Sequence, residues 1–170
     1  MMEKILVSQC LLGYKVNYRG EDALCEHPLF KQWREEGRLV FVCPEVSAGM
    51  SIPRIPSQIV GKGGGKAVLK KIAVVKDKEG CDVTDFYVRG AENALQIAQQ
   101  HHIKLAILKE RSPSCGSNQI YDGSFSGEKI AGEGVTAALL RSHDIRVFSN
   151  EQLEAAAEYL LQLESQNNAV

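Results

Sequence analysis

The sequence predicts an α/β protein with a Rossmann-like, three-layer α/β/α sandwich and a mostly parallel sheet. Short apolar runs typical of buried strands alternate along the chain with amphipathic stretches of helical length. Connections of this length suit crossovers between parallel strands. Helices that cover both faces of such a sheet give the three layers.

The regular elements follow in chain order. Strands are expected at five mainly apolar runs, namely 4–10, 38–43, 71–75, 105–108 and 145–148. Helices are expected at 26–36, from Thr84 to about 100, at 135–142 and after Ser149. Thr84 is expected to cap the second helix, whose apolar face is Tyr87, Ala91, Ala94, Leu95 and Ala98. Ser149 and Gln152 are expected to form a capping box for the last helix.

The remaining segments are expected to be irregular. Residues 51–60 are stiffened by two prolines, and the glycine-rich 61–66 is expected to be a mobile loop because it does not match a phosphate-binding motif. The Asp-Gly pair at 122–123 predicts a hairpin-like turn. We expect residues 1–165 to form a single domain and 166–170 a frayed tail.

Composition narrows the class of protein. The 170 residues carry a net charge of −1, with 44% hydrophobic and 24% charged residues, as in an ordinary soluble domain. Near-neutral charge argues against a broad nucleic-acid surface. The first residues do not have the pattern of a signal peptide, and no apolar run reaches the ~20 residues of a membrane span. We therefore expect a cytoplasmic protein with no membrane partner, whose thiols stay reduced.

Three cysteines follow expected strands. Cys10, Cys43 and Cys115 each come at or just after the end of an apolar run. Because the carboxyl ends of parallel strands meet at one edge, where α/β sheets bind ligands, these thiols are expected to converge. Cys25 and Cys81 follow no strand; Cys25 is expected to be a small buried hydrophobe, and Cys81 has no expected role.

Converging thiolates favour zinc, copper(I) or an iron–sulfur cluster. No CxxC pair is present, so the sequence matches neither a zinc ribbon nor a ferredoxin. Three unconnected buried thiols are the simplest alternative. If all three bind metal, they are one ligand short of a closed site, which leaves a position open to substrate.

Polar residues near these cysteines suggest further roles. Glu45 lies two residues after Cys43, where a carboxylate can act as a general acid or base. Ser112 and Ser114 flank a proline in the Cys115 loop, and Arg54 stands between two prolines. We expect Glu45 and Ser112 to be catalytic and Ser114 and Arg54 to bind substrate. The alternatives are an exposed glutamate, ordinary loop serines and a surface arginine.

Six segments together resemble the thiouracil desulfurase family of small desulfidases, long known as a domain of unknown function. They are VSQCLLG (7–13), CPEV (43–46), PRIP (53–56), LKERSPSCGS (108–117), YDGSFSG (121–127) and GVTAALL (134–140). The resemblance implies an oxygen-sensitive [4Fe-4S] cluster on Cys10, Cys43 and Cys115, with Glu45 and Ser112 beside its open iron. The chain departs from the family pattern at Gln9 and in its long glycine-rich tip.

The resemblance and the residues together predict a desulfidase. A thiopyrimidine (2- or 4-thiouracil, or its nucleoside) would exchange its thiocarbonyl sulfur for oxygen, with Glu45 activating water and Ser112 or Ser114 relaying a proton. This exchange is a net hydrolysis, because C=S and C=O carbons have the same oxidation level. The expected partner is therefore a small molecule, and tRNA is not expected without an extra domain.

Two alternatives belong to other classes. One is a non-catalytic module that carries zinc or a cluster, which would not need Glu45. The other is an enzyme with a single nucleophilic thiol, such as a low-molecular-weight phosphatase or an arsenate reductase. The sequence argues against the second alternative, since no arginine follows Cys10 at the spacing such an enzyme needs. The sequence makes no prediction of oligomeric state.

Overall fold

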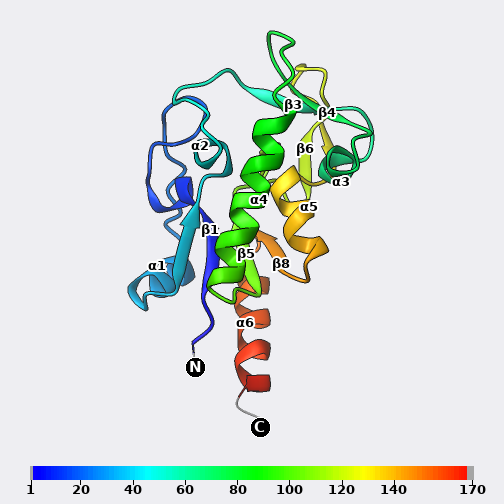
Figure 1. Ribbon diagram of the computed structural model, residues 1–170. Helices are drawn as coiled ribbons and strands as arrows, with labels where there is room; N and C mark the ends of the chain where they lie inside the picture. The colour runs from blue at the N-terminus through cyan, green and yellow to red at the C-terminus, as the bar shows by residue number, and fades with distance from the viewer. Residues whose placement is uncertain (1, 168–170) are drawn as a thin grey trace.

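A four-stranded parallel sheet lies at the centre of the computed structural model, which describes residues 2–167. Its strands are β1 (Ile5–Ser8), β2 (Leu39–Val42), β5 (Leu105–Leu108) and β8 (Arg146–Ser149), in the order β2-β1-β5-β8. All three neighbouring pairs are parallel, and all the strands therefore end at the same edge. Figure 1 shows this edge facing the upper part of the molecule.

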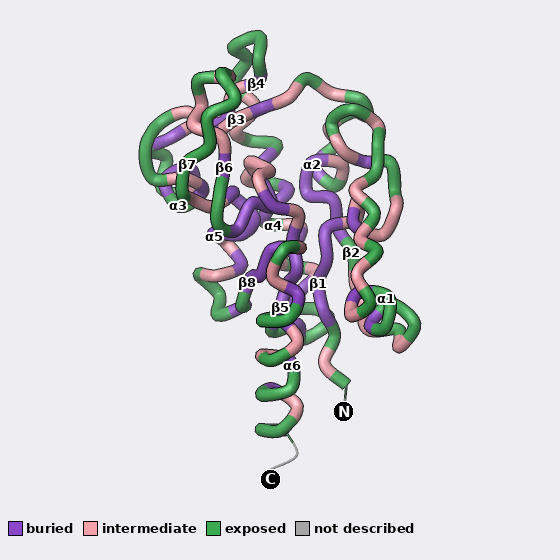
Figure 2. The backbone as a smooth tube through the Cα atoms, turned by 180° about the vertical axis from the view of Figure 1, so that it is seen from behind, coloured by how far each residue is buried: buried purple, intermediate pink, exposed green. Residues whose placement is uncertain are grey.

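Helices cover both faces of the sheet. They are α1 (Pro28–Glu35) and α6 (Leu153–Asn167) on one face, and α4 (Thr84–Gln100) and α5 (Val135–Ser142) on the other. Side chains alternate along β1, so that Ile5 and Val7 pack towards α1 and α6 and Leu6 towards α4 and α5. Figure 2 shows β1 and β5 buried along their length. These layers confirm the expected α/β/α fold class.

The third expected strand does not join this sheet. It is β4 (Val74–Asp77), which pairs antiparallel with β3 (Ser57–Val60) in a separate hairpin above the main sheet (Figure 1). The expectation that 51–60 is irregular is therefore wrong for its second half. Proline stiffening ends at Pro56, and the alternating burial of the next four residues makes a strand.

The glycine-rich segment is also more ordered than expected, because it contains α3 (Gly64–Leu69). Its Gly65 amide donates to the Glu133 carbonyl over 2.7 Å. A Cβ at Gly65 would lie 2.2 Å from the Gly134 carbonyl oxygen. Gly65 therefore allows the backbones of α3 and residues 133–134 to pack closely. The expectation that 61–66 is a mobile loop is wrong for its second half, which begins a helix.

Three short elements complete the chain. The 3-10 helix η1 (Gln9–Leu12) follows β1, and α2 (Pro44–Ser47) follows β2. The expected hairpin is present as β6 (Gln119–Tyr121) and β7 (Lys129–Ala131), joined by residues 122–128. Within residues 2–167, no helix is long and apolar enough to cross a membrane.

The helix ends differ from expectation in detail. Thr84 is the first residue of α4 rather than its cap, and its Oγ1 accepts from the Val75 amide over 2.9 Å. Half of the capping box forms, because Gln152 Oε1 accepts from the Ser149 amide over 3.0 Å while Ser149 Oγ accepts from Glu151. Helix α6 continues through Asn167, and residues 168–170 of the expected tail lie outside the described residues.

Strand β8 is an edge of the main sheet, and side chains bind its outward backbone groups. The Val147 carbonyl accepts from Arg141 Nη2 over 3.2 Å, and the Ser149 amide is bound by Gln152. Two of the groups that an edge strand would offer to another strand are therefore occupied.

Candidate active site

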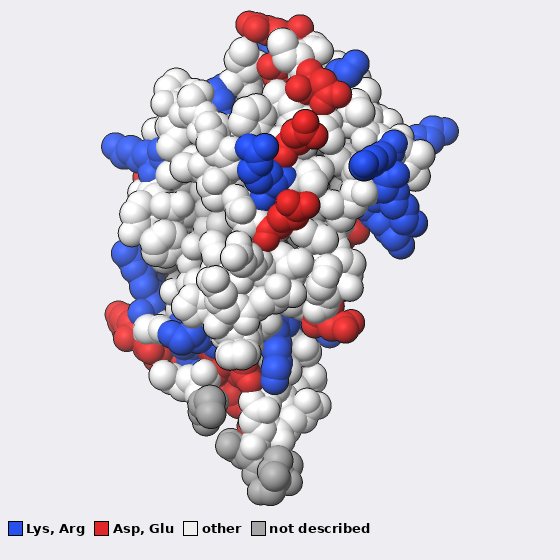
Figure 3. Space-filling model, in the orientation of Figure 1, with Lys and Arg blue, Asp and Glu red and all other residues white. Residues whose placement is uncertain are grey.

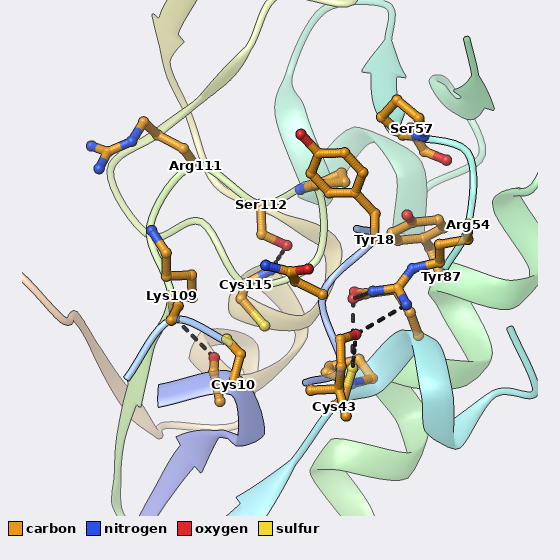
Figure 4. A pocket seen from close by; sticks show the side chains of 18 of the residues that line it. Cys10, Tyr18, Cys43, Arg54, Ser57, Tyr87, Lys109, Arg111, Ser112 and Cys115 are labelled. Carbon is orange, nitrogen blue, oxygen red and sulfur yellow. Dashed lines mark hydrogen bonds and ion pairs between the residues drawn. The ribbon is translucent and has the colours of Figure 1, made fainter. Parts of the chain in front are cut away.

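A cavity of about 350 Å³ opens at the carboxyl ends of β1, β2 and β5 (Figure 4). The loops after these strands form one side of it, and β3, its preceding segment and α4 form the other. The sulfur-bearing residues Cys10, Cys43 and Cys115 all line this cavity. Cys25 and Cys81 do not line it; Cys25 packs beside the core next to α1, and Cys81 is exposed.

Each of the three cysteines comes from a different loop. Cys10 lies in η1, one residue beyond the start of that turn, and is partly buried. Cys43 directly follows β2 and precedes α2, and Cys115 lies in the loop after β5; both are buried. A Cβ on Gly90 of α4 would lie 2.5 Å from the Pro44 carbonyl oxygen. This glycine lets α4 pack directly behind the Cys43 turn.

The thiols strongly resist ionisation in this cavity. Burial, with the charges of Cys43 and Glu45, raises the pKa of Cys10 to about 12. Burial and the Glu45 charge raise the pKa of Cys43 to about 11, and burial raises the pKa of Cys115 well above its ordinary value. Three thiolates could share this space only with a compensating cation, which is what a thiolate-bound metal centre provides.

The spacing of the donors bears on the kind of centre. Within residues 2–167, no three His, Cys, Asp or Glu side chains lie close enough together to hold a single metal ion. The irons of a cluster each take their own thiolate, so cluster ligands lie further apart than the ligands of one ion. Three thiols from three loops around one cavity are a donor set of the kind that iron–sulfur clusters use.

Glu45 is a buried carboxylate beside these thiols. It lies in the first turn of α2, and its Oε2 accepts from Arg54 Nη2 over 3.0 Å and lies 3.8 Å from Cys43 Sγ. Its other oxygen, Oε1, is buried without a hydrogen-bond partner. Buried charges are normally paired and hydrogen-bonded, so an unpaired oxygen in a cavity is available to a ligand or to a proton.

Arg54 is directed towards Glu45 rather than into open space. Its Nη1 donates to the carbonyls of Val16 and Ser51 over 3.1 and 3.4 Å, while Nη2 binds Glu45. Both partners of this ion pair are largely buried, with 7% and 10% of their side chains exposed. The guanidinium therefore lines the cavity and holds one carboxylate oxygen in place (Figure 4).

The two serines of the Cys115 loop have different positions. Ser112 lines the cavity, and its Oγ accepts from the amides of Ser114 and Cys115, both over 3.1 Å. Its hydroxyl proton remains available to an acceptor in the cavity. Ser114 is fully buried outside the cavity lining, with its Oγ 2.8 Å from Thr136 Oγ1 on α5. The expected substrate-binding role of Ser114 is therefore corrected, because this hydroxyl joins its loop to α5.

Sequence reasoning missed Glu110, which organises the same loop. Its Oε1 accepts from the amides of Ser117, Asn118 and Gln119 over 2.9, 3.0 and 3.1 Å. Burial opposes ionisation, but these amides and the Asn118 side chain outweigh it and lower the pKa of Glu110 to about 2. In the sequence, a glutamate at the end of a strand and before small polar residues is only a weak signal of this role. The hydrogen bonds between its carboxylate and the amides of residues 117–119 depend on how the loop folds back.

Two hydroxyls on the other side of the cavity were also missed. Ser57 begins β3, and Tyr87 lies on α4, where the helical pattern marked it only as a core residue. Both line the cavity. The sequence could not place Ser57 in the cavity, because strand β3 was not expected.

Comparisons with known proteins identify the family of this chain. The family model for 2-thiouracil desulfurase matches residues 5–152. The chain is 45% identical over 149 residues to the uncharacterized protein YbbK of Bacillus subtilis (strain 168), covering 88% of this chain and 97% of YbbK. It also resembles a solved structure of the [4Fe-4S]-dependent thiouracil desulfidase TudS, with a TM-score of 0.85, 43% identity, and coverage of 94% of this chain and 99% of the other. The chain belongs to the 2-thiouracil desulfurase family of enzymes.

Proposed function

We propose that this enzyme exchanges the thiocarbonyl sulfur of a thiopyrimidine for oxygen from water. The carbon–sulfur bond breaks, a carbon–oxygen bond forms, and the sulfur leaves as hydrosulfide. No electrons are transferred, because the carbon keeps its oxidation level. The observation that carries the proposal is the unpartnered, buried Oε1 of Glu45 in a cavity shared with three thiols.

Cys10, Cys43 and Cys115 would hold a [4Fe-4S] cluster, as the similarity to the TudS structure suggests. When bound by three protein thiolates, such a cluster supplies a Lewis acid with affinity for sulfur at the iron that has no protein ligand. Close backbone packing at Gly90 and Gly134 keeps the loops after β2 and β5 in place on this side of the cavity. A Cβ on Gly134 would lie 2.4 Å from the Ser114 carbonyl oxygen.

Glu45 is the proposed general base. Its Oε1 accepts a proton from the attacking water, while Arg54 holds Oε2 and compensates the buried charge. Ser112 is the proposed donor to the substrate, because its oxygen already accepts two amides and its proton is free. In this scheme Arg54 acts as a positioning residue for Glu45.

The size and charge of the site favour a free base or a nucleoside. A cavity of about 350 Å³ lies at the lower end of the range for small-molecule sites. Figure 3 shows acidic and basic side chains interspersed over one face of the molecule, and the net charge is −1. This face therefore has no continuous basic stripe of the kind that binds nucleic-acid backbones.

Substitution Glu45→Gln tests the proposal. We expect iron and labile sulfide per chain to stay at the wild-type level and kcat on 2-thiouracil to fall about 10²- to 10⁴-fold, the usual contribution of a general base. Glu35→Gln, at an exposed position of α1, is the matched control and should leave both values unchanged.

Unchanged turnover in Glu45→Gln would remove Glu45 from the reaction. A wild-type protein that takes up iron and sulfide but turns over neither 2- nor 4-thiouracil would instead support the non-catalytic cluster carrier.

A further inference from the structure

The side of the cavity formed by β3 and α4 carries two hydroxyl groups with no role so far. Ser57 and Tyr87 come from these two elements, and Figure 4 shows them away from Cys10 and Cys115. We call this pair the hydroxyl side of the cavity.

Ser57 has an unusual environment for a serine. Burial alternates along β3, so Ser57 and Ile59 both face inwards, with 8% and 2% of their surface exposed. Gln58 and Val60 are more exposed. Its Oγ is buried and has no hydrogen-bond partner within 3.5 Å, although it lies near enough to the Tyr87 hydroxyl to oppose the rise of the Tyr87 pKa. A hydroxyl left unsatisfied in the interior is costly, and a native protein normally avoids one unless a ligand or a water completes it.

Tyr87 brings a hydrogen-bond donor to the same place. Its ring belongs to the apolar cluster of Ile59, Val75 and Ala91, and only 3% of the residue is exposed. Burial, with the Glu45 charge, raises the pKa of Tyr87 well above its ordinary value, although Ser57 and Arg54 oppose this shift. The phenol therefore keeps its proton and can donate it to an acceptor in the cavity.

We propose that Ser57 and Tyr87 recognise the edge of the pyrimidine ring that carries a ring N–H next to a carbonyl. Tyr87 donates to the carbonyl oxygen. Ser57, which can both donate and accept, pairs with the ring N–H or shares the carbonyl. The inference rests on the proposed function, and it assigns to this pair the selection of pyrimidines that have a second, oxygen-bearing ring carbon.

The test compares two substrates of the cluster-loaded enzyme. 2-Thiouracil has the distal carbonyl, and pyrimidine-2-thione has the same thiocarbonyl without it. A site built to hydrogen-bond a group discriminates against an analogue that lacks the group. We therefore expect Ser57→Ala and Tyr87→Phe each to lower kcat/KM on 2-thiouracil about tenfold, mainly through KM, and to change pyrimidine-2-thione less than twofold.

Tyr159→Phe is the matched control, because it removes a phenol hydroxyl from α6 outside the cavity. It should leave the ratio of the two kcat/KM values unchanged. Equal losses on both substrates in Ser57→Ala and Tyr87→Phe, or no loss on either, would overturn the inference while leaving the desulfidase proposal intact. If Tyr87→Phe does not fold, Ser57→Ala alone decides, since it only removes an unpartnered oxygen.

Binding of uracil provides a second readout that needs no turnover. Uracil keeps the N–H and carbonyl edge but has no sulfur, and calorimetry on the loaded enzyme should show about tenfold weaker binding in Ser57→Ala and Tyr87→Phe. A wild-type enzyme inactive on 2-thiouracil and pyrimidine-2-thione would contradict the proposed function. Weaker uracil binding in Ser57→Ala and Tyr87→Phe would still support the proposed contacts. Uracil affinity unchanged in both variants would overturn it.

Discussion

The two sides of the cavity are built in different ways. On one, which we call the cysteine side, Cys10, Cys43 and Cys115 follow the adjacent parallel strands β1, β2 and β5. On the hydroxyl side, Ser57 and Tyr87 come from a separate hairpin and a helix, which meet through the apolar cluster around Ile59. The first arrangement follows from parallel pairing alone, whereas the second depends on packing between distant segments. The local sequence pattern thus encodes the proposed metal ligands, and tertiary structure encodes the proposed substrate contacts.

The largest effect is expected on the cysteine side. Cys43→Ser should abolish cluster uptake and lower turnover by more than about 10³-fold, because an alcohol does not replace a thiolate as a soft-metal ligand. Iron and labile-sulfide assays after anaerobic reconstitution measure this loss. Cys81→Ser, at an exposed cysteine, should match wild type. A fully loaded, active Cys43→Ser enzyme would contradict the ligand assignment.

The next test concerns the stability that comes from packing α4 behind the Cys43 turn, on the cysteine side of the cavity. Gly90→Ala should destabilise the protein by about 1–3 kcal/mol, because its Cβ would meet the Pro44 carbonyl at 2.5 Å and overpacking outweighs the better helix propensity of alanine. Denaturant unfolding measures the change. Glu92→Ala, on the exposed face of the same helix, should stay within about 0.5 kcal/mol of wild type. A stabilised Gly90→Ala variant would show that α4 can move away from the turn.

Arg54 lies between the two sides, and its loss should have an intermediate effect. Arg54→Met leaves the Glu45 carboxylate buried without its ion-pair partner, and we expect kcat to fall about 10- to 100-fold with the cluster content unchanged. Arg54→Lys should recover part of the loss. Arg89→Met is the control, because Arg89 is an exposed residue of α4 that does not line the cavity. A raised KM with unchanged kcat would instead favour direct substrate binding by Arg54.

The last effect is confined to acid pH and concerns the stability of the Cys115 loop. Because the pKa of Glu110 is about 2 in the folded protein and about 4.3 in an unfolded chain, its contribution is complete above pH 5 and is lost as the pH falls towards 2. Unfolding free energy measured across this interval should fall less steeply in Glu110→Gln than in wild type. Parallel curves would mean that the amides of residues 117–119 do not depend on this charge.

Sequence alone was sufficient where a feature depends on neighbours in the chain. The helix expected at 135–142 is α5 with its observed ends, and the apolar runs before Cys43 and Cys115 predicted β2 and β5. It failed where a distant backbone decides the outcome. The glycine-rich run around Gly65 suggested a mobile loop, because the sequence does not show that Gly65 packs against the backbone of Gly134. The sequence left open whether Ser112 or Ser114 relays a proton, and only the folded loop shows that the Ser114 hydroxyl faces Thr136 on α5.

The bonds that Arg141 and Gln152 make along β8 also bear on how copies of this chain could meet. Extending the sheet across that strand would require a second molecule to displace both side chains and leave the Arg141 guanidinium to find another acceptor. Continuous sheets between subunits, and the fibrous aggregation that exposed strand edges promote, are therefore disfavoured on this flank. Sheet extension between copies would have to use the other edge of the sheet, at β2.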